Sequence, residues 1–249
     1  GDVIIIYNEG SHGIWDTYQK LNWDDHVKDL KRKLSYATAT LSRIRKFIPE
    51  NLHKDLYYTL FESILTYGIS VWGGISQSKI NTLHVSQKRC TRILFGDMDA
   101  YLDIFRTCSR TRPKSFQILG ADFYRKEHTK PLFKKHSILC VQNLYNYHCF
   151  MEIFKILKFR SPLSIHSGFQ FSKYNNLTLI TPPPDNLFFY KSAYIWNKLY
   201  PKLKIRDFSA PIGLVKNTLK KSIFHNQHQS EIIEWQPTHD YNIDRIKNC

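Results

Sequence analysis

A helical period of apolar side chains, unbroken from Asp24 to Ile48, most constrains how this chain can fold. Val, Leu and Ile recur there at steps of three, four and seven residues, as they do along one face of an α-helix. Asp24 or Asp25 is suited to cap the first turn, and Pro49 ends the helix at the residue before it. The segment therefore predicts a long amphipathic helix. Its apolar face is formed by Val27, Leu30, Leu34, Leu41, Ile44 and Ile48.

The same period returns in later segments and predicts a mainly α fold. From residue 161 to 190 the period is lost, and Pro182 begins a run of prolines that marks an irregular loop. The predicted fold class is a helical bundle followed by a smaller, mostly helical C-terminal region with irregular loops. Further helices are expected at residues 51–67, 78–95, 131–157 (one helix or two), 190–199 and 210–224.

Local details of two of these helices follow from single residues. Gly96 comes directly after the helix at 78–95, in the position where a left-handed residue commonly ends a helix. The helix at 51–67 is expected to direct its longest apolar side chains into the core. These are Leu56, Leu60, Ile64 and Leu65.

The basic charge of the chain is concentrated in its middle and later part. The sequence has 36 Lys and Arg against 21 Asp and Glu, a formal net charge of +15. Residues 1–100 carry 13 basic and 11 acidic side chains, residues 101–221 carry 21 and 6, and residues 222–249 carry 2 and 4. Such a block attracts polyanions, and it favours nucleic acid as a partner over a basic surface that serves only solubility. Aromatic residues suited to base stacking lie between the charges: Phe105, Phe116, Phe123, Tyr124, Tyr145 and Tyr147.

The five cysteines are predicted to be reduced thiols of an intracellular protein, nuclear or cytoplasmic. Their number is odd, their spacing is irregular, and neither a secretion signal nor a membrane-spanning stretch of about 20 apolar residues occurs. Cys140, His148 and Cys149 leave a zinc site open as an alternative, although adjacent His and Cys do not follow the usual spacing of zinc ligands. Because the chain begins with Gly1 and not with Met, we expect a fragment of a longer protein.

Short motifs follow one another in a fixed order along the chain. They read LNWDDHV at 21–27, LTYGISVWG at 65–73, QKRCTRIL at 87–94 and AYIWNKLY at 193–200. Together they resemble the C-terminal portion of the reverse transcriptases of non-LTR retrotransposons, of the jockey-like or a related type. The residues that carry the resemblance are Trp23, His26, Tyr67, Gly68, Trp72, Gly73, Gln87, Trp196 and Asn197.

The resemblance implies that residues 21–96 form the thumb of an RNA-directed DNA polymerase, a helical bundle that holds template and primer. An N-terminal junction at 1–20, which has no assignment, would precede the thumb. After the thumb we expect a basic helical region at 97–160, a C-terminal region at 161–224 and a polar tail at 225–249.

The same resemblance places the chemistry of the polymerase outside this chain. Nucleotide polymerisation uses two divalent metal ions, held in this family by an aspartate pair of the palm, which precedes the thumb. That motif does not occur here, and the only adjacent aspartates, Asp24 and Asp25, open the first helix. We therefore expect no catalytic residue, no metal ligand and no cofactor in this chain, and no catalysis by the chain alone.

Basic helix faces are the predicted contact with nucleic acid, because Lys and Arg neutralise phosphates without reading sequence. The expected partners are RNA, an RNA/DNA hybrid and the upstream palm and fingers, with no membrane and no small-molecule substrate. The alternative is a helical interaction module, or a decayed transposon relic, without a catalytic role. The predicted nucleic-acid-binding residues are Lys28, Lys31, Arg32, Lys88, Arg89, Arg92, Arg110, Arg112 and Lys114.

Overall fold

The structure is a computed structural model, and it describes residues 23–96, 129–173, 177–183, 187–203, 205 and 207–228. Helices account for 77% of these residues, and their only β-pairing is an isolated bridge between Phe171 and Leu179. The mainly α fold class predicted from the sequence is confirmed. The predicted junction at 1–20 lies outside the described residues.

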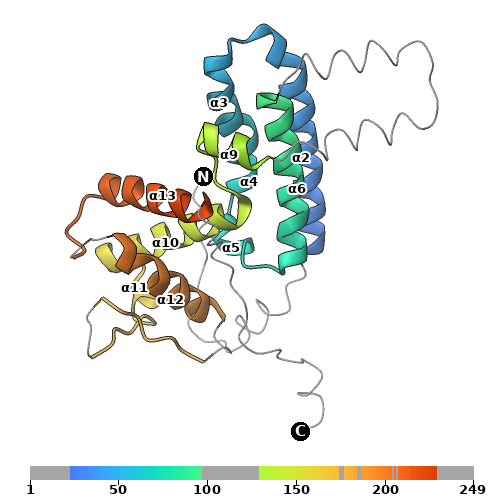
Figure 1. Cartoon of the computed structure of the whole chain (residues 1–249). Helices are drawn as coiled ribbons and strands as arrows, with labels where there is room; N and C mark the ends of the chain where they lie inside the picture. The colour runs from blue at the N-terminus through green and yellow to red at the C-terminus, as the bar shows by residue number, and fades with distance from the viewer. Residues whose placement is uncertain are drawn as a thin grey trace, which may run out of the picture.

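Two long helices, α2 (Asp24–Ile44) and α6 (Gln77–Phe95), pack side by side and run parallel (Figure 1). Their beginnings are joined by an ion pair of 2.7 Å between Lys79 and Asp24. Near their ends, the guanidinium of Arg45 donates hydrogen bonds to the carbonyls of Ile93 (2.6 Å) and Gly96 (2.7 Å). The apolar stripes predicted for both helices face each other in the core, as their 3.6-residue period requires.

The ends of these two helices differ from the sequence prediction. Trp23 takes the N-cap position of α2, so Asp24 and Asp25 lie in the first turn and neither caps it. Gly96 is extended (φ −74°, ψ 165°), so the left-handed ending expected for α6 is wrong. Glycine is needed there for space, because an added Cβ would lie 2.4 Å from the carbonyl oxygen of Arg92.

Between the long helices the chain contains a π-helix, which changes the predicted inward face. The segment consists of α3 (His53–Leu56), a π-helix (Tyr57–Glu62) and α4 (Ser63–Thr66). Tyr57, Phe61 and Leu65 are fully buried, whereas Leu60, expected inward, is 36% exposed. An α-helix also places residues four apart on one face, so the spacing of the inward residues is as expected, but the series that begins at Tyr57 faces the core instead of the one that begins at Leu56.

A left-handed glycine leads from this segment to the next helix. Gly68 has φ +62°, and α5 (Ile69–Trp72) begins directly after it. The helix predicted at 51–67 thus ends just before a glycine, the residue that takes this left-handed conformation without steric cost.

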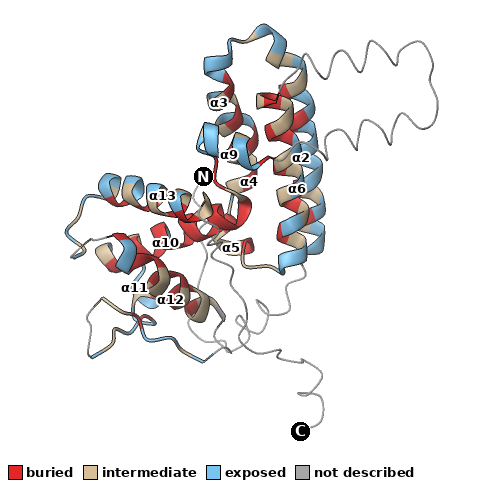
Figure 2. Cartoon of the chain, in the orientation of Figure 1, coloured by how far each residue is buried: buried red, intermediate tan, exposed pale blue. Residues whose placement is uncertain are grey.

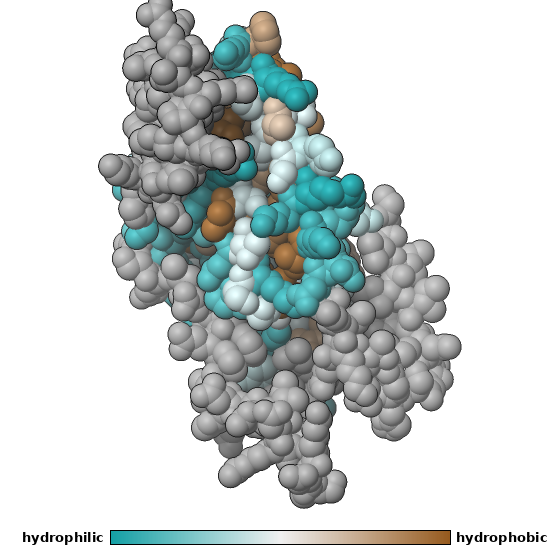
Figure 3. All heavy atoms as spheres, turned by 90° about the vertical axis from the view of Figure 1, so that its right-hand side faces the viewer, coloured by the Kyte–Doolittle hydropathy of each residue, from teal (hydrophilic) through white to brown (hydrophobic). Residues whose placement is uncertain are grey.

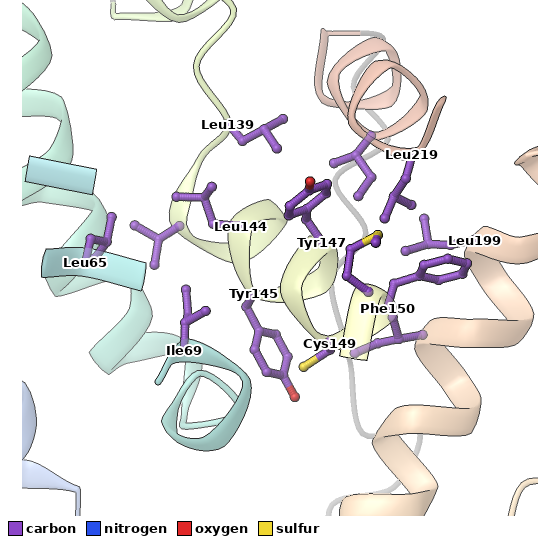
Figure 4. Close-up of a cluster of buried hydrophobic side chains, with 14 of the residues drawn as sticks. Leu65, Ile69, Leu139, Leu144, Tyr145, Tyr147, Cys149, Phe150, Leu199 and Leu219 are labelled. Carbon is purple, nitrogen blue, oxygen red and sulfur yellow. The ribbon is translucent and has the colours of Figure 1, made fainter. Parts of the chain in front are cut away.

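The second half of the described chain is arranged around α10 (Val141–Phe159), which is buried along nearly its whole length (Figure 2). Its buried residues lie on several sides of the helix and include the polar Gln142, Asn143 and Asn146, so α10 needs neighbours on more than one side. Figure 4 shows Leu65 and Ile69 approaching α10 from one side, and Leu199 and Leu219 from the other. The ranges predicted as separate regions thus share one hydrophobic core. The covering helices of this half are α9 (Lys130–His136), α11 (Leu163–His166), α12 (Leu187–Leu199) and α13 (Ile212–His228).

The predicted polar tail begins later than residue 225. The helix α13 continues to His228, and Asn226 in its last turn is buried. The side-chain oxygen of Gln227 accepts hydrogen bonds from the amide of Cys140 and from Asn143, each 2.9 Å, and its nitrogen donates to the carbonyl of Ile138 (3.0 Å). The end of α13 is therefore fixed to the beginning of α10.

Candidate nucleic-acid interface

The outer side of α6 carries basic side chains without acidic ones. Its four charged residues are Lys79, Lys88, Arg89 and Arg92, and none is acidic. Arg89 is exposed, while Lys88 and Arg92 are half-buried because their aliphatic stems lie along the helix surface. The three residues predicted to bind phosphates therefore reach the surface from successive turns of one helix.

The predicted residues of α2 are all exposed, but their charges are not equally available. Asp29 forms ion pairs with Arg32 (2.6 Å) and Lys33 (2.9 Å), and their hydrogen bonds lower the pKa of Asp29 to about 2. Arg32 therefore shares its charge with a neighbour, although such an exposed pair is weak. Lys28 and Lys31 form no ion pair with any described residue, so they are the stronger candidates.

The parallel packing fixes the positions of the two basic groups along the helix pair. The contacts of Asp24 with Lys79 and of Arg45 with Ile93 and Gly96 set the beginnings and the ends of α2 and α6 level with each other, so the middle of α2 is level with the middle of α6. Lys88 and Arg89 accordingly lie closer to the C-terminal ends of the two parallel helices than Lys28 and Lys31 do. Figure 3 shows the α2 side of this pair, where the described surface is predominantly hydrophilic. We call the exposed side of α2 and α6 that carries Lys28, Lys31, Arg32, Lys88, Arg89 and Arg92 the basic face.

The predicted set of basic residues and the exposed basic residues of the structure differ next to α6. Arg110, Arg112 and Lys114 lie outside the described residues. Conversely, α9 adds exposed lysines at 134 and 135 that were not predicted as sites. Rings of Phe133 and His136 pack against His84 and Phe95 and hold α9 on α6. The basic run in KPLFKKH was a visible signal, but its apolar residues favoured a buried helix.

Two of the aromatic residues considered for base stacking lie in the core. Tyr145 and Tyr147 belong to α10 and are 6% and 8% exposed. For these two residues the alternative interpretation of the sequence, that the aromatics are core residues, is the one that holds. The other four, Phe105, Phe116, Phe123 and Tyr124, lie outside the described residues.

Most of the motif residues form packing contacts inside the bundle. The ring of His26 lies between those of Trp23 and Trp72, with centroid distances of 5.6 and 5.5 Å. Burial and the nearby charge of Lys33 lower the pKa of His26. The indole nitrogen of Trp72 donates a 2.8 Å hydrogen bond to the carbonyl of Tyr67. This cluster fixes the beginning of α2 against α5.

Gln87 is the most connected of the motif residues. Its amide nitrogen donates to the hydroxyl of Tyr57 (2.9 Å) and to the carbonyl of Leu139 (2.8 Å). Its oxygen accepts a bond of 3.2 Å from the amide of Val141 and lies 3.0 Å from Nδ1 of His84. Fully buried, Gln87 joins α6, the π-helix and α10, which is a structural role.

The late motif fixes the irregular segment before α12. Asn197 donates to the carbonyl of Leu179 (2.8 Å) and accepts from its amide (2.9 Å), as a neighbouring strand would. Trp196 donates to the carbonyl of Leu177 and stacks on Phe150 at 4.9 Å. Close packing also requires glycine at position 73, because an added Cβ would lie 2.5 Å from the ring of Tyr145.

Comparison with protein-family models, with curated proteins and with solved structures finds no match to this chain. In the part of the chain that the structure describes, no helix is long and apolar enough to cross a bilayer. Over the same residues, no three His, Cys, Asp or Glu side chains gather as ligands for a metal ion. Cys149, considered as a zinc ligand, is buried with its thiol 3.9 Å from the carbonyl of Ser70.

Proposed function

We propose that this chain binds nucleic acid through the basic face. The observation that supports the proposal is the parallel packing of α2 and α6, two neighbouring helices that both carry predicted cations outside the core. Exposed Lys and Arg on a rigid pair of helices can neutralise successive phosphates without contacting bases. Binding of this kind depends strongly on salt and weakly on sequence.

We further propose that the chain is the thumb and following region of a reverse transcriptase of the non-LTR retrotransposon type. The sequence motifs support this proposal, and so does the fact that the residues carrying them are contact positions of one fold. Trp72, Gln87 and Trp196 are buried. In this role the chain grips RNA or an RNA/DNA hybrid, and a separate palm and fingers provide the chemistry.

A salt titration tests the basic face. In the first variant Lys88, Arg89 and Arg92 are each changed to Gln, and binding of a labelled single-stranded RNA and of an RNA/DNA hybrid is measured between 50 and 300 mM salt. If these side chains contact three phosphates, the slope of log K against log salt becomes shallower by about two to three. Affinity at low salt falls at the same time.

The control variant removes the same charge elsewhere. Lys173, Lys216 and Lys221 are exposed, and Lys216 and Lys221 belong to α13. Changing these three to Gln is expected to leave the slope close to that of the wild type. If both variants lower the slope equally, the basic face has no special role and binding reflects only net charge.

A further inference from the structure

A pocket lies where the turn between α5 and α6 meets α10 and α12. It consists of two adjoining hollows of about 240 and 320 Å³. Both are lined by Gly74, Ile75, Ser76, Tyr145 and Lys191. The larger hollow lies at the lower end of the range for pockets that bind small organic ligands, roughly 300–1,000 Å³.

Two polar atoms of this pocket converge on Gly74. A Cβ added to Gly74 would lie 3.0 Å from Nζ of Lys191 and 3.0 Å from Oη of Tyr145. The ammonium of Lys191 also donates a hydrogen bond to the carbonyl of Gly74. Because glycine has no side chain, the ammonium and the phenol can both pack closely against Gly74, at the wall of the hollows that they line.

The chemistry of the lining suits an anion that carries an aromatic group. Ser192 adds a hydroxyl, Lys79 adds a cation that is already paired with Asp24 at 2.7 Å, and no Asp or Glu belongs to the lining among the described residues. Burial lowers the pKa of Lys191 to about 8, so a bound anion would stabilise its charged form. Trp23 and Phe188, both half-buried, supply aromatic surface beside these polar groups.

We propose that this pocket binds a nucleotide, whose phosphate accepts hydrogen bonds from Lys191 and Tyr145 and whose base lies against Trp23 and Phe188. Charge-assisted bonds of an ammonium and a phenol to phosphate oxygens are of the strong kind. The nucleotide is either a free monophosphate or the 5′-terminal nucleotide of a strand. The proposal does not depend on the basic face, whose six residues lie outside the pocket.

Calorimetric titration of the whole chain with AMP, adenosine and ribose 5-phosphate tests the ligand class. We expect AMP to bind more tightly than either of the others, since only AMP offers both the phosphate and the base. Equal affinity for AMP and adenosine would overturn the phosphate contact. Equal affinity for AMP and ribose 5-phosphate would overturn the base contact, and no heat with any of the three would overturn the whole proposal.

Three variants test the assigned residues. Lys191→Met keeps the apolar stem and removes the charge, and it is expected to weaken AMP binding about tenfold or more. Tyr145→Phe removes only the phenol oxygen, and Gly74→Ala places a methyl where the two polar atoms converge. Both should weaken AMP binding even if Lys191→Met does not fold. Lys198→Met on the same helix is the matched control and should bind like the wild type.

Unchanged AMP affinity in the folded Tyr145→Phe and Gly74→Ala variants would contradict the assignment. The source of the nucleotide is distinguished by oligonucleotides with a 5′-phosphate or a 5′-hydroxyl. A preference for the 5′-phosphate that Lys191→Met abolishes supports a strand end as ligand, whereas AMP binding without such a preference supports a free nucleotide. Failure of RNA binding at the basic face would leave the AMP result unaffected, so the two proposals fail separately.

Discussion

Glu62 closes the π-helix with a carboxyl group that is buried beside Tyr147 of α10 and Lys220 of α13. Its Oε2 atom is fully enclosed and has no hydrogen-bond partner among the described residues. Burial raises the pKa of Glu62 to about 7, and the nearby charge of Lys220 offsets only part of this effect. The negative charge of Glu62 in turn contributes to the raised pKa values of Tyr57, Tyr58 and Tyr147.

This residue makes stability depend on pH in a defined direction. The folded protein holds the proton more tightly than the unfolded chain, in which a glutamate has a pKa near 4.5. Stability is therefore highest below pH 4.5 as far as Glu62 contributes, and it falls as the pH rises to about 7. A difference of this size corresponds to about 2–3 kcal/mol of unfolding free energy.

Replacing Glu62 by Gln should remove that loss. We compare the unfolding free energy of Glu62→Gln with that of the wild type at two pH values. Between pH 5 and pH 8 this difference should shift by about 2 kcal/mol in favour of the variant. Urea unfolding followed by tryptophan fluorescence at both pH values measures this. Glu152→Gln is the control, because Glu152 is exposed and pairs with Lys155. A stability difference for Glu62→Gln that does not change with pH would show that the carboxyl keeps an ordinary pKa.

At the residue scale the sequence showed which side chains belong to the core, but not the bonds that they form. Gln87 lies on the buried side of α6, among apolar residues. One of its four hydrogen-bond partners, His84, belongs to α6 itself, and the other three come from two segments that are distant in sequence. Such a network depends on tertiary packing and leaves no local pattern, which is why a buried glutamine could not be explained beforehand.

At the element scale, the end of α6 depends on a residue that follows α2. The last carbonyls of a helix have no intrahelical partner. Here the guanidinium of Arg45 donates to two carbonyls at this end, those of Ile93 and Gly96. Its charge is also favourable at the negative end of the helix dipole. This arrangement replaces the left-handed ending that Gly96 led us to expect.

The Arg45→Met variant tests this contact. Losing two charge-assisted hydrogen bonds should lower the unfolding free energy by about 1–3 kcal/mol and loosen the last turn of α6. Hydrogen exchange should become faster in a peptide covering residues 90–96 than in one covering the beginning of α6. Arg43→Met is the matched control, because Arg43 is exposed on the same turn of the chain. Equal effects of the two variants would argue against a specific cap.

Long helices with a regular apolar period could be predicted from the sequence. Short helices and irregular turns, which depend on a few residues, could not. The extent of α6 agrees with the prediction to within one residue, whereas α2 ends at Ile44, four residues before the predicted Ile48, and a 3-10 turn (Arg45–Phe47) follows it. The π-helix was missed because one widened turn leaves no pattern in the sequence, and Phe61 is buried there instead of Leu60. The lysines of α9 were missed because the apolar residues of this short helix dominated its interpretation.

At the scale of the whole molecule, α10 connects the halves of the described chain. It packs against α5 and α6 on one side and against α12 and α13 on the other. The apolar run from Val141 predicted a buried helix, but not that both halves would cover it. The basic face could be predicted residue by residue for α2 and α6, whereas their parallel arrangement depends on contacts between distant segments.

This arrangement predicts that the described helices unfold together. Phe150 is fully buried on α10 and stacks on Trp196 of α12, 4.9 Å away. Phe150→Ala should lower the unfolding free energy by about 3–5 kcal/mol, through lost apolar contact and the cavity left behind. Because the core is continuous, protection against hydrogen exchange should fall by a similar factor in α2, α6, α12 and α13.

Phe159→Ala provides the control on the same helix, because Phe159 is 58% exposed at its end. It should change the unfolding free energy by less than about 0.5 kcal/mol. If Phe150→Ala lowers protection in α12 and α13 but leaves α2 and α6 unchanged, the bundle at 23–96 is a separate folding unit. In that case the region predicted as a thumb could hold its basic face without the helices that follow. Uniform loss of protection instead means that the basic face exists only when the whole core is formed.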